Sequence, residues 1–262
     1  MEVAGEMTKA LLIDSSNSAC SVCITTDRVV IGHNYAPMET GHASVIVPMI
    51  QSTMTEAKAR FDELCFVAVT HGPGSFTGLR ISLAAAKAIA LSNNIPLYGV
   101  SCFDAIAGRL TANTTLSKTD LLLIAIESKR KELYLECLNK HGVKIIESQS
   151  LSAPDIITQL ARLYQPGETV RIAGDAGFSL VKEIEKLIKP NGKSFTEDFR
   201  GVDALDITNT ENFWKLFKYS EHRDYSHQVN LQYLRKPDIS IPKKQCHRQI
   251  KTANDHIFVA KE

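Results

Sequence analysis

The sequence predicts an α/β fold made of two halves of similar design. Residues 71–80, HGPGSFTGLR, place three glycines between an apolar run and an alanine-rich run. A hairpin, and later a strand, a glycine loop and a helix, occur in the same order in both parts of the chain. The length of 262 residues, with 44% hydrophobic and 23% charged residues, suits one large or two small globular domains.

The first half begins with a predicted β-hairpin and a helix. Residues 10–14, ALLID, read as an apolar strand, residues 15–18 as a polar turn, and the chain then returns as a second strand. A helix is expected over residues 45–60, because apolar residues recur there at near-helical spacing and the proline lies close to the start.

A strand, a glycine turn and a second helix follow. Residues 64–70, LCFVAVT, predict a buried strand, and residues 79–91 have the length and composition of a helix. Such a turn points backbone N–H groups and the positive end of the helix dipole at one place, which suits a phosphate group. The alternative is a tight turn that holds nothing, since glycine is the usual residue wherever φ is positive.

The spacing of this loop excludes the two commonest phosphate motifs. Gly72, Gly74 and Gly78 read G-x-G-x-x-x-G, which differs from the Rossmann fingerprint, and Leu79 stands where a P-loop requires lysine. The loop belongs to neither class.

The second half repeats the plan. Residues 121–126, LLLIAI, lead through a charged turn into ELYLECL, and later TVRIA, GDAG and FSLVKEIEKLI supply a strand, a glycine loop and a helix. We interpret this as an internal duplication; chance recurrence of common α/β units is the alternative. Two such halves would face a shared cleft able to hold a nucleotide. The candidate nucleotide or anion-binding residues are Asp14, Gly72, Gly74, Gly78, Gly174 and Gly177.

The net charge and the cysteine spacing limit the functions that the sequence supports. The formal net charge of +1, without a long basic block, argues against an autonomous nucleic-acid binder but not against a subunit of one. No signal peptide and no apolar run of membrane-spanning length is seen, so a soluble cytoplasmic protein with no membrane partner is expected.

The cysteines lack the spacing of a disulfide framework, and buried thiols are expected. They are Cys20, Cys23, Cys65, Cys102, Cys137 and Cys246.

Four segments resemble one known family. GPGSFTGLRISLAAAKAIA, ALLIDSS, GHASVIVPMI and QYLRKP are similar to the TsaB (YeaZ) family of the actin, sugar-kinase and heat-shock ATPase superfamily. The resemblance covers roughly residues 8–238. It implies two ribonuclease-H-like domains, which we expect at residues 8–110 and 111–238. Residues 239–262, with mixed charges and little periodicity, read as a flexible tail.

The resemblance also implies a function. TsaB is understood as the non-catalytic partner of TsaD in forming N6-threonylcarbamoyladenosine at position 37 of tRNAs that read codons beginning with A, with the ATPase TsaE completing the complex. TsaD-like proteins carry a His-x-x-x-His metal pair, whose places are taken here by Cys102 and Ile106. We therefore expect no catalytic residue, metal or cofactor in this chain, with ATP and metal used by the partner subunits and tRNA reached through the complex.

The two first-half helices are the expected contact with TsaD. The second is apolar nearly all round, which exceeds the single stripe needed to cover a sheet, although a wholly internal helix is the alternative. Family resemblance implies a four-helix contact, and without TsaD the same helices would be available for a homodimer. The predicted interface residues are Ile46, Met49, Ile50, Met54, Leu83, Ala86, Lys87 and Ala90.

A second function class is an autonomous nucleotide-dependent kinase or ATPase that uses Asp14 and both glycine loops. Asp14 stands at the end of the first strand, where relatives in the superfamily handle Mg²⁺. Its turn, Asp14 to Ser18, lacks the glycine and lysine that bring backbone and a cation close to phosphates. Weak or no nucleotide binding by the isolated chain is therefore expected.

Overall fold

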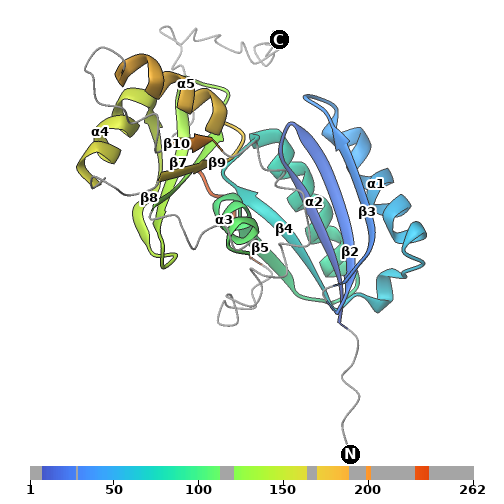
Figure 1. Cartoon of the computed structure of the whole chain (residues 1–262). Helices are drawn as coiled ribbons and strands as arrows, with labels where there is room; N and C mark the ends of the chain where they lie inside the picture. Colours follow the sequence, from blue (N-terminus) through green and yellow to red (C-terminus); the bar gives the residue numbers. More distant parts are fainter. Residues whose placement is uncertain are drawn as a thin grey trace, which may run out of the picture.

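The computed structural model describes residues 8–27, 29–112, 121–163, 170–188, 199–201 and 228–235. These residues form two five-stranded sheets with helices against them (Figure 1). The tail 239–262 and Cys246 lie outside the described residues. No helix in the described ranges is both long and apolar enough to cross a membrane.

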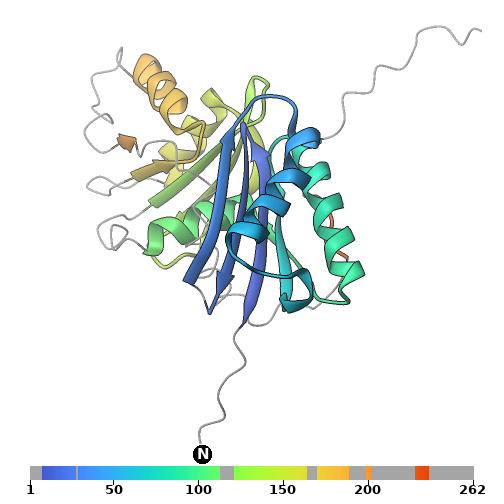
Figure 2. The same cartoon turned by 90° about the vertical axis from the view of Figure 1, so that its right-hand side faces the viewer.

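The first sheet has the strand order β3-β2-β1-β4-β5. Strand β1 pairs antiparallel with β2 and parallel with β4, and α1 and α2 cover one face of the sheet (Figure 2). The elements are β1 (Lys9–Asn17), β2 (Ala19–Thr26), β3 (Val29–Pro37), α1 (His42–Glu56), the 3-10 turn η1 (Phe61–Glu63), β4 (Phe66–Gly72), α2 (Phe76–Ser92), β5 (Leu97–Ser101) and α3 (Cys102–Ala112).

The second sheet repeats the topology of the first. Its order is β10-β9-β6-β7-β8, so that reading from β8 gives the same arrangement, with β6 antiparallel to β7 and parallel to β9. The predicted internal repeat is therefore present as a repeated sheet. The elements are β6 (Leu121–Glu127), β7 (Glu132–Asn139), β8 (Lys144–Ser152), α4 (Ala153–Leu163), β9 (Val170–Ala173), α5 (Gly177–Ile188) and β10 (Phe199–Gly201).

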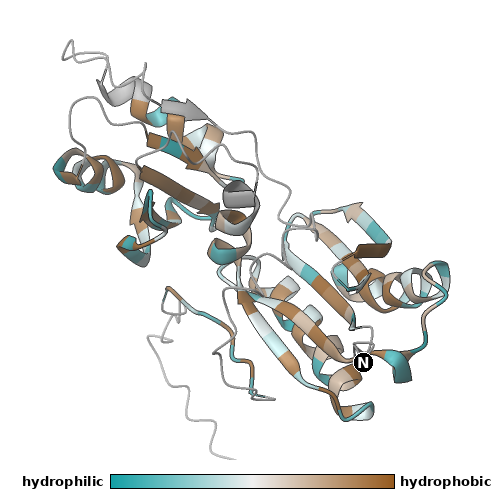
Figure 3. Ribbon diagram, turned by 60° about the horizontal axis from the view of Figure 1, so that its bottom comes forward, coloured by the Kyte–Doolittle hydropathy of each residue, from teal (hydrophilic) through white to brown (hydrophobic). Residues whose placement is uncertain are grey.

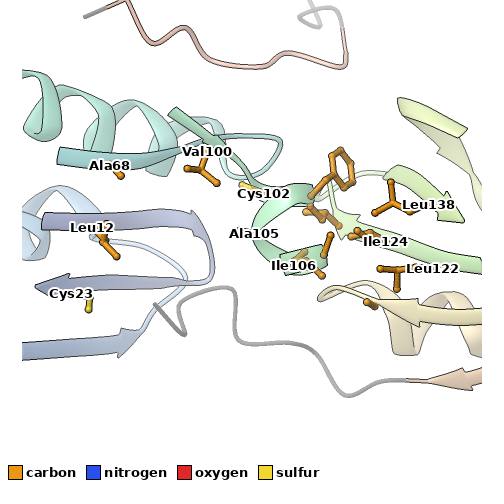
Figure 4. Packing of buried hydrophobic residues seen from close by; sticks show 14 of the residues in the cluster. Leu12, Cys23, Ala68, Val100, Cys102, Ala105, Ile106, Leu122, Ile124 and Leu138 are labelled. Carbon is orange, nitrogen blue, oxygen red and sulfur yellow. The ribbon is translucent and has the colours of Figure 1, made fainter. Parts of the chain in front are cut away.

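Three apolar clusters hold these layers together. One packs α1 and α2 on the first sheet, a second packs α4 and α5 on the second sheet, and a third surrounds α3. Figure 3 shows hydrophobic residues along the strands and mixed hydropathy on the helices. Helix α3 lies between the two sheets, where Ala105 and Ile106 pack with Leu12 of β1 and Ile124 of β6 (Figure 4). The halves thus share one core across α3.

A short segment of residues 228–235, here called the returning segment, comes back to the first half. Val229 is buried in the cluster beneath α1 and α2, and Leu234 packs against the cluster around α3. Gln232 donates its backbone N–H to the carbonyl of His71 over 2.8 Å. The segment therefore lies directly beside the glycine loop.

Several element ends differ from the sequence prediction. Strand β1 continues to Asn17 instead of turning after Asp14, and Ser15 and Ser16 are buried beneath the glycine loop. Helix α1 spans His42–Glu56 rather than residues 45–60, and Lys58 just beyond it has a φ of 49°. Helix α2 begins at Phe76, three residues earlier than predicted, because the Ser75 side chain caps it.

Candidate functional site

Asp14 is fixed at the end of β1 by its neighbours in the first sheet. One carboxylate oxygen, Oδ1, accepts the N–H of Ser16 at 2.9 Å and the hydroxyl of Thr70 on β4 at 2.5 Å. The residue is only 5% exposed. The predicted nucleotide-site carboxylate thus ties the ends of two central strands together.

Gly74 and Gly78 bring the loop backbone against β1. A Cβ at Gly78 would lie 1.9 Å from the carbonyl oxygen of Ser15, and one at Gly74 would lie 2.2 Å from that of Ser16. The contact is hydrogen-bonded in both directions. Ser75 donates its N–H to the Ser16 carbonyl over 2.6 Å, and the Ser15 hydroxyl donates to the Gly78 carbonyl over 2.7 Å. These two glycines are required by the packing of the chain on itself.

Gly72 meets the returning segment instead. Its φ of +115° favours glycine, and a Cβ there would lie 3.0 Å from the backbone oxygen of Gln232. At the start of α2, the N–H groups of Gly78 and Leu79 already donate to the side-chain and backbone oxygens of Ser75. Local packing therefore accounts for the three glycines without a phosphate, and their use in anion binding stays a prediction.

The second glycine loop has the same construction. Gly174 has a φ of +97°, and a Cβ there would lie 2.1 Å from the carbonyl oxygen of Ala125 on β6. That oxygen also accepts the N–H of Ala176 at 3.2 Å. Gly177 differs, since its nearest neighbour would be in ordinary contact at 3.5 Å. In each half, a glycine loop therefore packs against the end of the first strand.

Asp175 and Lys129 occupy the second-half side of this region. Burial raises the pKa of Asp175 above its usual range, and the hydrogen bond that its carboxylate accepts from the N–H of Glu127, at 2.8 Å, opposes this only in part. Lys129 donates its Nζ to the hydroxyl of Ser18 over 3.3 Å. The tips of the two hairpins are therefore in contact.

Cys102 and Ile106, in the places of the metal pair, are packed inside the core around α3. They are 0% and 1% exposed, and both belong to the apolar cluster that joins the sheets (Figure 4). Burial, with the nearby charge of Asp14, raises the pKa of the Cys102 thiol far above its usual value. The thiol is protonated at neutral pH, and isoleucine offers no ligand atom. Within the described ranges, no group of three or more His, Cys, Asp or Glu side chains is arranged to hold a metal ion.

The structure places most of the predicted contact residues on α1 and α2 in the chain's own core. Most of them face the chain's own sheet and are between 0% and 8% exposed, because the apolar stripe of each helix fills the first-half core. These buried residues are Ile46, Ile50, Met54, Leu83, Ala86 and Ala90; Met49 and Lys87 are partly exposed.

The outward faces of the same helices carry a different set of residues. Val47 of α1 is 50% exposed and Leu91 of α2 is 68% exposed, and Ala84 and Ala88, at helical spacing from Leu91, are also exposed on α2. These four residues are here called the outer helix face. The spacing of Ala84, Ala88 and Leu91 was visible in the sequence, but only the sheet decides which face points outward.

Two sheets of one strand order, joined through a central helix, define the actin-like ATPase fold, with two ribonuclease-H-like halves. Solved structures share this fold. YeaZ from Pseudomonas aeruginosa superposes with a TM-score of 0.64 at 20% identity, covering 87% of this chain and 100% of that one. Lmo2764 from Listeria monocytogenes gives a TM-score of 0.50 at 10% identity, covering 82% and 100%.

Sequence comparison narrows the class to one family. The model of the family TsaD, tRNA N6-adenosine threonylcarbamoyltransferase, matches residues 37–200. The tRNA threonylcarbamoyladenosine biosynthesis protein TsaB of Buchnera aphidicola from Acyrthosiphon pisum is 32% identical over 153 residues, 57% of this chain and 67% of the relative. TsaB of Escherichia coli is 32% identical over 127 residues, 48% and 53% of the two chains. The chain belongs to the TsaB (YeaZ) family, and it spans about half to two thirds of the curated relatives it matches.

Proposed function

We propose that this chain is a non-catalytic subunit in the formation of N6-threonylcarbamoyladenosine at position 37 of ANN-decoding tRNAs. It would bind TsaD and hold that subunit in its active conformation, with TsaE and tRNA joining the assembled complex. ATP and metal would be used by the partner subunits. The setting would be the cytoplasm, where the tRNA substrates are.

The outer helix face carries this proposal. Leu91 exposes 68% of its surface at the end of α2, and Ala84 and Ala88 leave room for another helix to approach the same face. Burying a large apolar side chain contributes roughly 1.5–3 kcal/mol, so a partner helix here would be stabilised by contact with Leu91 and Val47. A TsaD subunit related to this chain would present equivalent helices, which gives a four-helix contact.

The candidate chemical positions support the non-catalytic part. Cys102 and Ile106 are enclosed in apolar packing, and the loop glycines other than Gly177 pack closely against the chain's own backbone. An enzyme of the kinase or ATPase kind would need these loops open to phosphate.

The test is formation of the modified nucleoside on unmodified tRNA. TsaD and TsaE are supplied with threonylcarbamoyl adenylate, with and without this chain, and the chain is assayed alone. We expect product only when TsaD and this chain are both present. Product formation indifferent to this chain would overturn the proposal, and nucleotide turnover by the chain alone would favour the autonomous kinase or ATPase.

A further inference from the structure

An exposed cluster of two aromatic rings and a guanidinium lies at the start of α2. Phe76 and Tyr233 are 52% and 56% exposed, and their ring centroids are 5.8 Å apart. The guanidinium carbon of Arg80 lies 3.7 Å from the centroid of Phe76, and its Nη2 donates to the hydroxyl of Tyr233 over 3.4 Å. Figure 2 shows the returning segment, in red, beside α2. We call Phe76, Arg80 and Tyr233 the stacking cluster.

The stacking cluster is not part of the protein core. None of its three residues belongs to the apolar clusters that hold the sheets and helices together. Two elements separated by more than a hundred residues of sequence nevertheless bring the rings and the cation into contact. An ordered π surface in water, without a packing role, is typical of a surface that stacks against a ligand.

The surroundings of the stacking cluster are rich in cations. Arg235 lines a hollow of about 40 Å³ together with Phe76 and Tyr233, and it approaches the carboxylate of Glu132 at 3.7 Å. Glu132 begins β7, directly after three consecutive exposed cations at the tip of the hairpin, Lys129, Arg130 and Lys131. The carboxylates beside these cations are Glu127, Glu132 and Asp175, so Lys129, Arg130, Lys131 and Arg235 outnumber them.

We propose that the stacking cluster binds an unpaired base of an RNA strand, with the flanking phosphates on the cations of the β6–β7 hairpin. Bases stack on aromatic rings and on guanidinium planes, and cations beside the rings attract the phosphate backbone. The inference rests on the proposed function, because tRNA is the RNA that such a complex would hold. The net charge of +1 fits a local contact that adds to the binding of a partner rather than a strong site of its own.

The second half provides a matched control. Phe178, the second residue of α5, is 66% exposed, and the Nζ of Lys182 lies 4.2 Å from its ring centroid, so an aromatic ring and a cation recur at the same spacing. Within the described ranges no second ring contacts Phe178. The pair at α5 therefore also holds a cation over a phenylalanine ring, with an ammonium in place of the guanidinium, and it lacks the contribution of the returning segment.

The experiment measures binding of a fluorescent tRNA transcript to the full chain in complex with TsaD, as the change in anisotropy. We expect Tyr233→Ala and Phe76→Ala each to weaken binding about tenfold, since each removes a ring on which the base stacks. Tyr233→Phe keeps the ring and should retain most of the affinity, and Phe178→Ala should bind like the parent protein. A transcript carrying 4-thiouridine, irradiated in the complex, should cross-link to peptides containing residue 76 or 233.

Other outcomes separate this inference from the proposed function. Parental tRNA affinity in both alanine variants, with cross-links elsewhere, would overturn the RNA contact even if threonylcarbamoyladenosine formation still required the chain. Normal tRNA binding with loss of TsaE binding would show that the surface takes a protein partner, which also overturns it. Thermal unfolding of each variant verifies that the fold is intact, and Arg80→Gln offers a second variant that leaves both rings in place and should still reduce affinity.

Discussion

At the scale of single residues, glycine illustrates how much of this site was visible in the sequence. The number and spacing of Gly72, Gly74 and Gly78 predict a tight loop between a strand and a helix, and that loop is present. The residues that contact these glycines could not be predicted, because Ser15, Ser16 and Gln232 are far from the loop in sequence. A loop that packs closely on the backbone and a loop that binds a phosphate both require glycines, so the sequence pattern does not distinguish the two.

This packing makes the loop glycines sensitive to a single methyl group. Gly78→Ala would place a Cβ 1.9 Å from a backbone oxygen, and we expect it to lower the free energy of unfolding by at least about 2–3 kcal/mol. Gly177→Ala is the control, because its Cβ would meet only ordinary contacts and alanine favours the helix by up to about 1 kcal/mol. Urea unfolding measures both variants. Equal stability of the two would show that the loop does not press on β1.

Cysteine reactivity gives a second test at this scale. Burial raises the pKa of Cys20 to about 11 and that of Cys137 to about 12. At pH 8 a thiol of pKa about 11 is thiolate in roughly one molecule in a thousand, and only the thiolate reacts. Among the described cysteines, we expect iodoacetamide to label the exposed Cys65 first in the native protein. Peptide mass spectrometry shows the order of labelling, and early labelling of Cys102 would contradict its burial in the cluster around α3.

At the scale of elements, helix α2 shows where sequence periodicity stops being informative. Its existence was predicted from length and composition, but an apolar sequence nearly all round leaves the orientation of the helix open. The first sheet selects Leu83, Ala86 and Ala90 as the inner face and leaves Ala84 and Ala88 outside. The choice depends on where β1 and β4 lie beneath the helix, which is tertiary information.

A charge on the outer helix face should separate binding from stability. Ala88→Glu puts a carboxylate in the proposed contact, where burial of an unpaired charge is costly, so we expect association with TsaD to weaken at least tenfold. Its effect on the free energy of unfolding should stay within about 0.5–1 kcal/mol, because the position is exposed. Isothermal titration with TsaD measures the affinity. Thr158→Glu on the exposed side of α4 is the control, and equal TsaD binding by both variants would place the contact elsewhere.

At the scale of the whole molecule, the repeated sheet topology was predictable, but the packing between the two halves was not. Recurrence of hairpin, strand, glycine loop and helix predicted two similar sheets, because each unit is local in sequence. The packing of α3 between the sheets joins Ile106 to Leu12 and Ile124, and no local pattern specifies that assembly. The same packing places Cys102 and Ile106, which stand where TsaD-like proteins carry the histidine pair, in the core.

Because both sheets contribute to the cluster around α3, a cavity there should weaken both. Ile106→Ala removes a side chain that is 1% exposed, and we expect a loss of about 2–5 kcal/mol in the free energy of unfolding. Hydrogen exchange should show reduced protection in β1 and β6 together. Leu160→Ala in α4, whose cluster lies within the second half, should instead affect β6 more than β1. Loss of protection confined to β1 after Ile106→Ala would argue against a shared core.

The returning segment sets an order on biosynthesis. Val229 is buried against the core beneath α1 and α2, and Gly99 is shaped to receive it, since a Cβ at Gly99 would lie 2.7 Å from a Val229 methyl group. A nascent chain emerges from the ribosome from its N-terminus, so the first sheet and its helices are made long before residue 229. The first half, although it is synthesised first, is therefore completed last, and until then the place beside Gly99 that Val229 fills is not covered.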